Sequence, residues 1–266
     1  RILVDWWEVW GNIWIKYSKS VGWIGFIIER ATLKLIMLLG GSLVTDSTLE
    51  KSRLVAILGG ESKIELIANG IPKEEIGELE SKPSYEFDIG NFGRLKNHKR
   101  VDLLLHSIAI LKNEYRIVAK TAIIGDGPEN QKLQLLSKSL GISEHVKFFG
   151  EIENQSECYD ILKKCKLSVV TTISGGGGNL TLLECFGCGL PVIGFATKDG
   201  LDPELIENNK NGILVTQPNA HQLAKALFKV LSDSKFHERL RDGAILKSKQ
   251  HDWETVASSY KTLLIE

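Results

Sequence analysis

Two basic side chains, Arg94 and Lys99, lie five residues apart in the stretch GRLKNHK that begins at Gly93. The apolar run over residues 87–92 reads as a strand, and a helical pattern follows Lys99, so both cations fall in the turn between the two elements. A guanidinium can pair with two phosphate oxygens at once, and an ammonium adds a point charge. The pair therefore indicates a site for a phosphorylated ligand. Two solvated surface cations are the alternative interpretation.

A second pattern typical of phosphate binding is a β-branched stretch that ends in four glycines, Gly175–Gly178, and gives way to helical spacing at Asn179. Free backbone amides at the start of a helix, together with the helix dipole, favour a bound anion. The alternative is a flexible linker, although linkers rarely separate a buried strand from a buried helix. The expected contacts are Gly176, Gly177, Gly178 and the amides of Asn179, Leu180 and Thr181.

Glu184 is the one carboxylate in the otherwise apolar helix that follows the glycines. A carboxylate in such a place should be buried together with hydrogen-bond partners. Ribose hydroxyl groups would serve as partners, and a polar group inside the protein core is the alternative. Three other positions add expected contacts: Gly93 at the start of GRLKNHK, Gly125 in the turn GDGP, and the backbone at Glu151 and Ile152, which would face a flat base.

These loops must be positioned by the elements around them. Strands alternate with helices from about residue 84 to residue 250, and one of the expected strands covers residues 116–124. Such alternation predicts the α/β class, with a doubly wound parallel sheet whose carboxyl edge gathers the loops at one crevice. Residues 1–83 alternate over too few elements for a complete sheet. We therefore expect a partial N-terminal Rossmann-like domain that ends in a charged interdomain linker over 73–84, and a last helix over 251–266.

The sequence also excludes several other kinds of protein. Lys plus Arg equals Asp plus Glu, at 33 each, so no nucleic-acid partner is expected. The first turn of the sheet lacks the GxGxxG of dinucleotide-binding dehydrogenases, and no GK[ST] follows the glycines. We interpret Cys185 and Cys188 as small core residues rather than a metal or redox half-site, because a second CxxC and a nearby histidine are missing. A reducing, cytoplasmic location follows.

Several blocks of the sequence, in order, resemble the retaining GT-B glycosyltransferases of family 4, the "group 1" transferases. They run from about residue 60 to the end: ANGI from Ala68, GRLKNHKRVDLLL from Gly93, IIGDGPE from Ile123, VKFFGEI from Val146, LTLLECFGCGLPVIG from Leu180, NGILV from Asn211 and HDWETVASSY from His251. The resemblance implies a GT-B fold of two facing Rossmann-like domains, with the last helix crossing back to the first domain. It also implies that a sugar passes from a nucleoside-diphosphate sugar to an acceptor hydroxyl with retention of configuration.

The same resemblance assigns roles to residues and partners. Arg94 and Lys99 would hold the diphosphate, Glu184 would bind the ribose, and Ile152 would meet the base through its backbone. The amides of residues 179–181 would assist. No metal and no cofactor are implied, and the acceptor would be a glycan or a lipid-linked sugar.

Two departures from the family pattern affect these expectations. Gly176 stands eight residues before Glu184, where the family carries a second glutamate that touches the donor sugar. The chain also begins after the part of the family that supplies an N-terminal glycine loop and the acceptor site. A non-catalytic nucleotide-sugar-binding module that needs a partner chain is therefore the alternative function.

Tryptophan is concentrated near the start of the chain, where the first 23 residues hold Trp6, Trp7, Trp10, Trp14 and Trp23. One interpretation is an aromatic belt that contacts the inner membrane surface near a lipid-linked acceptor. The other is an ordinary hydrophobic core.

Overall fold

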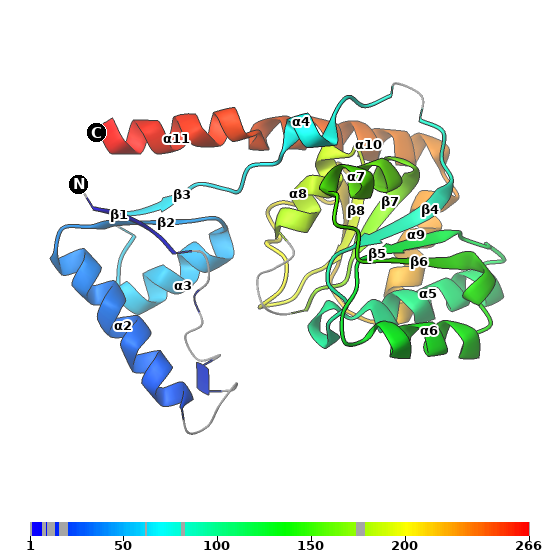
Figure 1. Ribbon diagram of the computed structural model, residues 1–266, viewed down its shortest axis with the longest axis horizontal. Helices are drawn as coiled ribbons and strands as arrows, with labels where there is room; N and C mark the ends of the chain where they lie inside the picture. The colour runs from blue at the N-terminus through cyan, green and yellow to red at the C-terminus, as the bar shows by residue number, and fades with distance from the viewer. Residues whose placement is uncertain are drawn as a thin grey trace. The chain divides into compact units, whose positions relative to one another are not determined.

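The computed structural model describes residues 2–6, 9, 14–15, 21–61, 63–80, 83–173 and 179–265. The chain divides into two compact units, each built on a parallel β-sheet (Figure 1). The smaller unit is Arg1–Asn69 with Glu254–Glu266, and the larger unit is Gly70–Trp253. The predicted α/β class is confirmed.

The larger unit contains a six-stranded sheet in which every neighbouring pair is parallel, in the order β6-β5-β4-β7-β8-β9. The chain moves outward from β4 through β5 to β6, and then returns to place β7 on the other side of β4. The strand order therefore reverses between β4 and β7, which is where open α/β sheets bind ligands. The strands are β4 (Phe87–Phe92), β5 (Thr121–Ile124), β6 (Val146–Gly150), β7 (Cys165–Val170), β8 (Val192–Phe195) and β9 (Gly212–Val215).

Helices cover both faces of this sheet (Figure 1). In β5, Ile123 packs in the core cluster on one side, whereas Ala122 and Ile124 pack in the cluster on the other. Because both faces are buried, the strands read as apolar runs rather than as alternating patterns. One face holds α5 (Val101–Glu114), α6 (Asn130–Ser139) and α9 (Ala220–Leu231), and the other holds α4 (Lys73–Ile76), α7 (Gln155–Lys163), α8 (Asn179–Gly187) and the end of α10 (Ser234–Ser248). Short 3-10 turns are η1 (Asn97–Lys99), η2 (Ser143–His145) and η3 (Lys249–His251).

Two element predictions were wrong. The stretch interpreted as a linker begins with α4, whose Ile76 is buried in the larger unit and whose last carbonyl accepts a hydrogen bond from Lys163 Nζ (2.8 Å). The strand predicted from Arg116 begins only at Thr121. Arg116 has a left-handed φ of 60°, and the N–H of Ile117 donates back to the carbonyl of Leu111, so these residues close α5 instead.

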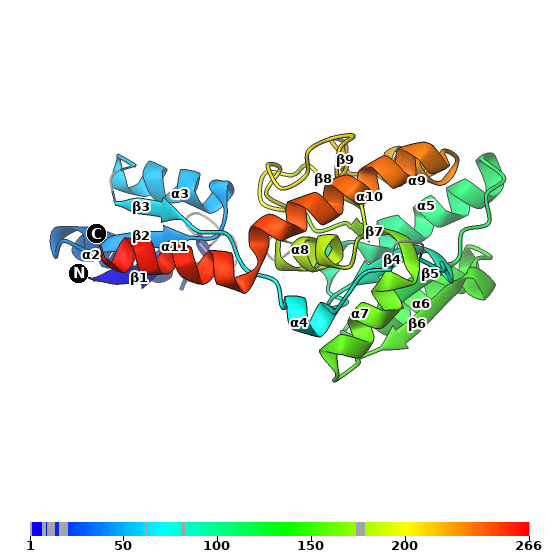
Figure 2. The same cartoon turned by 90° about the horizontal axis from the view of Figure 1, so that it is seen from above.

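The smaller unit contains a three-stranded parallel sheet of β1 (Leu3–Asp5), β2 (Ser42–Thr45) and β3 (Ile64–Leu66). One face is covered by α2 (Gly22–Leu38) and α3 (Thr48–Leu58), and the other by α11 (Trp253–Ile265), which runs along the sheet in Figure 2. Tyr260 of α11 donates a hydrogen bond to Asp5 (2.8 Å). Among the described residues, no helix is long and apolar enough to cross a membrane.

Candidate functional site

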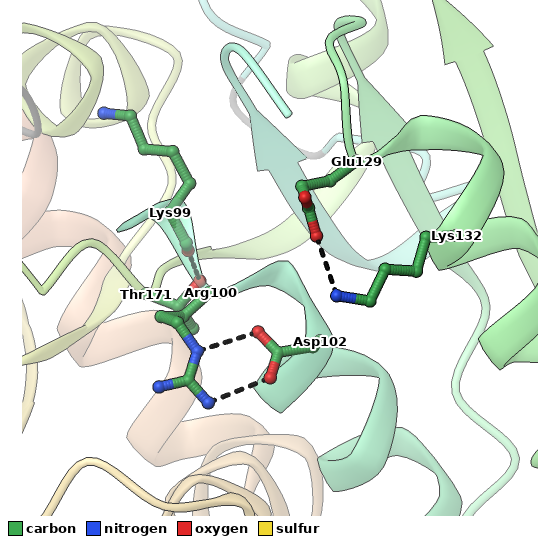
Figure 3. Close-up of polar contacts among 6 residues, drawn as sticks. All are labelled: Lys99, Arg100, Asp102, Glu129, Lys132 and Thr171. Atoms are coloured by element: carbon green, nitrogen blue, oxygen red, sulfur yellow. Dashed lines mark hydrogen bonds and ion pairs between the residues drawn. The ribbon is translucent and has the colours of Figure 1, made fainter. Parts of the chain in front are cut away.

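The loops that follow β4 and β7 are hydrogen-bonded to each other at the point where the strand order reverses. Thr171 Oγ1 donates to the carbonyl oxygen of Lys99 (2.5 Å), as Figure 3 shows. The N–H of Ile173 donates to the carbonyl of His98 (3.0 Å). These bonds hold η1, and with it Lys99, against the end of β7.

A small hollow at this edge of the sheet brings together four of the predicted ligand contacts. Its lining includes Gly93 and Arg94 from the loop after β4, Lys99 from η1 and Thr181 from the first turn of α8. The guanidinium of the neighbouring Arg100 is already paired with the carboxylate of Asp102 through two hydrogen bonds, each 2.9 Å long. It is therefore less available to bind an anion than Arg94 or Lys99. Figure 3 shows the side chain of Lys99 extending away from that pair. Arg94 and Lys99 are thus the cations that line the hollow.

Positive charge is concentrated in this hollow. Burial lowers the pKa of the Lys99 ammonium, and the nearby charges of Arg94 and Lys96 lower it further. A bound anion would relieve this repulsion and favour the charged form of Lys99. This concentration of positive charge favours an anion over a neutral or cationic group, and diphosphate binding here stays a prediction.

Gly125 and Gly127 allow the loop after β5 to approach the loop after β4. A Cβ atom on Gly125 would collide with the carbonyl oxygen of Gly93, and one on Gly127 would collide with that of Leu95. Both glycines have positive φ angles, of 123° and 156°. The N–H of Leu95 also donates to the carbonyl of Asp126 (2.8 Å). Gly125 was predicted to contact the ligand, and here it supports the backbone of Gly93, which lines the hollow.

Glu184 is buried, with 6% of the residue exposed, and it has partners within the protein. Its Oε1 accepts hydrogen bonds from Tyr159 Oη (2.7 Å) and from Gln155 Nε2 (3.2 Å). Burial raises the pKa of the Glu184 carboxyl group, while both hydrogen bonds act in the opposite direction. The polar core partner considered as an alternative is therefore present for one carboxylate oxygen. Ribose binding by Glu184 stays a prediction.

Sequence reasoning missed Gln155 and Tyr159. They are four residues apart at the start of α7, a spacing that places two side chains on the same helix face. That spacing is a signal in the sequence, but nothing in the sequence indicates that this face meets Glu184.

The remaining predicted contacts lie near the hollow or outside the described residues. Gly176, Gly177 and Gly178 lie outside the described residues. Asn179 begins α8 and Leu180 is exposed in its first turn, while Glu151 and Ile152 follow β6. The N–H of Gly125 donates to the carbonyl of Gly150 (2.8 Å), which brings the loop after β6 beside the loop after β5. Glu151 and Ile152 do not line the hollow itself.

The cysteines are core residues, as predicted. All four are buried and free of disulfides, and Cys185 Sγ contacts Ser168 Oγ (3.2 Å). Burial raises the pKa of the Cys185 thiol to about 12, which disfavours the thiolate needed for metal or redox chemistry. The described part of the chain contains no group of three or more His, Cys, Asp or Glu residues that could hold a metal ion.

Comparison with known proteins identifies the family. The family described as "Glycosyl transferases group 1" matches residues 72–247, which include the hollow and most of the larger unit. This chain belongs to that family. The resemblance to the group 1 glycosyltransferases that the sequence indicated is confirmed.

Two curated relatives illustrate the match. The N-acetyl-alpha-D-glucosaminyl L-malate synthase of Bacillus anthracis is 31% identical over 195 residues, which are 72% of this chain and 47% of that protein. The N-acetylgalactosamine-N,N'-diacetylbacillosaminyl-diphospho-undecaprenol 4-alpha-N-acetylgalactosaminyltransferase of Campylobacter jejuni is 27% identical over 200 residues, 73% of this chain and 52% of that protein. The chain thus spans about half the length of the curated relatives it matches.

A solved structure shares the fold. Anabaena Alr3699/HepE in complex with UDP-glucose matches 99% of this chain and 72% of its own, with a TM-score of 0.76 and 19% sequence identity. HepE is a GT-B structure, so the predicted GT-B type of fold is confirmed.

Proposed function

We propose that this protein is a retaining glycosyltransferase that moves a sugar from a nucleoside-diphosphate sugar to an acceptor hydroxyl. The observation that supports it most directly is the hollow at the β4–β7 switch point, where Arg94 and Lys99 converge with the first turn of α8. Membership of the group 1 family supports the reaction class, and HepE, with the same fold, was solved with UDP-glucose.

The hollow would contribute mainly to the departure of the nucleoside diphosphate. When the bond between the sugar and the β-phosphate breaks, the electron pair moves onto the phosphate oxygen, and negative charge accumulates there. Preorganised cations and helix amides at that position stabilise this charge more than they stabilise the ground state. In front-side attack, the acceptor oxygen bonds to the same face of the sugar carbon, and its proton passes to the departing phosphate.

The test separates binding from transfer. The purified chain is titrated with UDP, GDP and ADP by calorimetry, and glucose release from UDP-glucose is followed in parallel. We expect at least one nucleoside diphosphate to bind, together with slow hydrolysis of a matching donor. Failure of all three nucleotides to bind would contradict the proposal.

The alternative is a nucleotide-sugar-binding module that becomes active only with a partner chain. The feature that favours it is Gly176, which stands where the family pattern carries a second glutamate. In the titration above, nucleotide binding without any release of sugar would support this alternative.

For the acceptor, we propose a glycan or a lipid-linked sugar at the cytoplasmic surface of the membrane, by analogy with the undecaprenol-linked substrate named for the Campylobacter relative. The helix α2 supports a membrane contact, because Trp23, Ile24, Ile27 and Ile28 on it are each more than half exposed. Trp7 and Trp10 lie outside the described residues. Apolar and aromatic side chains on one exposed helix favour the membrane interface.

Liposome flotation tests this contact. We expect the chain to float with vesicles that contain anionic lipid, and the variant Ile24→Ser with Ile27→Ser to remain in the soluble fraction. The matched control is Leu246→Ser, since Leu246 is similarly exposed on α10 of the larger unit. Equal behaviour of all three proteins would argue against a membrane contact through α2.

A further inference from the structure

Glu184 is held from one side by a pair of residues on α7. Tyr159 Oη donates to Glu184 Oε1 (2.7 Å), and Gln155 Nε2 donates both to the same carboxylate oxygen (3.2 Å) and to Tyr159 Oη (3.1 Å). The three side chains thus form a closed triangle of hydrogen bonds. Tyr159 is fully buried, so its hydroxyl cannot exchange this partner for water.

The two oxygens of the Glu184 carboxylate are therefore in different environments. Oε1 receives both hydrogen bonds, whereas Oε2 receives none from the described residues. Oε2 is thus left to accept hydrogen bonds from water or from the hydroxyl groups of a ligand. With Oε1 fixed, the orientation of Oε2 is fixed as well.

These three side chains lie next to the hollow at the β4–β7 edge. Glu184 lies one turn after Thr181 on α8, and Thr181 lines the hollow. On the other side, Gln155 is the first residue of α7 and lies three residues after Ile152, at the end of the loop that follows β6. The free carboxylate oxygen therefore lies between the turn expected to hold phosphate and the turn expected to meet a base.

We propose that Tyr159 and Gln155 are positioning residues that turn Glu184 so that one carboxylate oxygen is left for a ribose, which makes the site selective for ribonucleotides over deoxyribonucleotides. This inference rests on the proposed function, in which Glu184 contacts the ribose. Neither α7 residue contacts the ligand; both act through Glu184. A purely structural role for the triangle would lower the affinity for both kinds of nucleotide equally.

The test compares UDP with 2′-deoxy-UDP and 3′-deoxy-UDP by calorimetry, or the corresponding GDP or ADP set if another base binds. In the wild-type protein, we expect at least one deoxy analogue to bind about 10-fold to 100-fold more weakly, the scale for a hydrogen bond to a charged group. In Tyr159→Phe, that ratio should fall to about threefold or less, because Glu184 loses its shortest hydrogen bond and its fixed orientation. Gln155→Leu should reduce the ratio in the same direction by a smaller factor.

The matched control is Tyr115→Phe, which removes a hydroxyl from a tyrosine that stacks on Phe228 on the opposite face of the sheet. It should keep the wild-type ratio. An unchanged ratio in a folded Tyr159→Phe protein that still binds UDP would overturn the positioning role, and it would leave the proposed function intact. Should the wild-type protein bind none of the three ribonucleotides, the proposed function would fail together with this inference.

Discussion

Removing the two cations of the hollow should abolish most of the affinity for a nucleoside diphosphate. Arg94→Ala is expected to weaken binding by about 1.5–3 kcal/mol, the range for a charge-assisted hydrogen bond, which is roughly a 10-fold to 100-fold change in Kd. Lys99→Ala should cost a similar or smaller amount. Calorimetry with UDP, GDP and ADP measures both effects.

The two substitutions should not be additive. Arg94 is one of the charges that lower the pKa of Lys99, so each cation changes the cost of holding the other in the empty hollow. A double-mutant cycle isolates this coupling. The matched control is Lys132→Ala, which removes a lysine that is exposed and paired with Glu129 (3.2 Å; Figure 3). Unchanged affinity in both Arg94→Ala and Lys99→Ala would rule out the hollow as the diphosphate site.

The sequence was sufficient to predict where this hollow lies. Parallel strands buried on both faces give apolar runs, and the loops at their carboxyl ends must meet at one edge. Arg94, Lys99 and Thr181 belong to loops or helix starts at that edge, so their convergence follows from the alternation of elements alone. The ability of these residues to bind an anion also comes from their own side chains or amides. It could therefore be predicted without knowing which distant residues they contact.

The parts that the sequence did not predict depend on contacts between distant residues. Tyr159 reads as an ordinary core aromatic on an amphipathic helix, and only the packing of α7 against α8 brings its hydroxyl to Glu184. The role of Gly127 likewise depends on the close approach of the carbonyl of Leu95, more than 30 residues earlier. Element ends were misplaced where single backbone conformations decide them, as at Arg116.

Glu184→Gln should weaken nucleotide binding and leave the protein as stable as before. If the free carboxylate oxygen accepts hydrogen bonds from a ribose, loss of its charge should cost roughly 10-fold to 100-fold in Kd. Burial raises the pKa of Glu184, so the ionised form costs folding free energy above that pKa, and this cost disappears as the pH falls through it. A neutral glutamine avoids the cost, so the melting temperature at neutral pH should be unchanged or slightly higher.

For Glu50→Gln we expect the opposite of Glu184→Gln, namely a loss of stability without a loss of nucleotide affinity. Glu50 is also buried, but both of its oxygens have partners: Oε2 accepts from the N–H of Val9 (2.8 Å) and Oε1 from Arg53 (2.5 Å). Its substitution should lower the melting temperature, because a buried network loses its charge, and should leave nucleotide affinity unchanged. Calorimetry and thermal melts on both variants therefore separate a binding role from a core role. A large loss of melting temperature in Glu184→Gln with intact affinity would assign Glu184 to the core and remove the ribose contact from the proposed site.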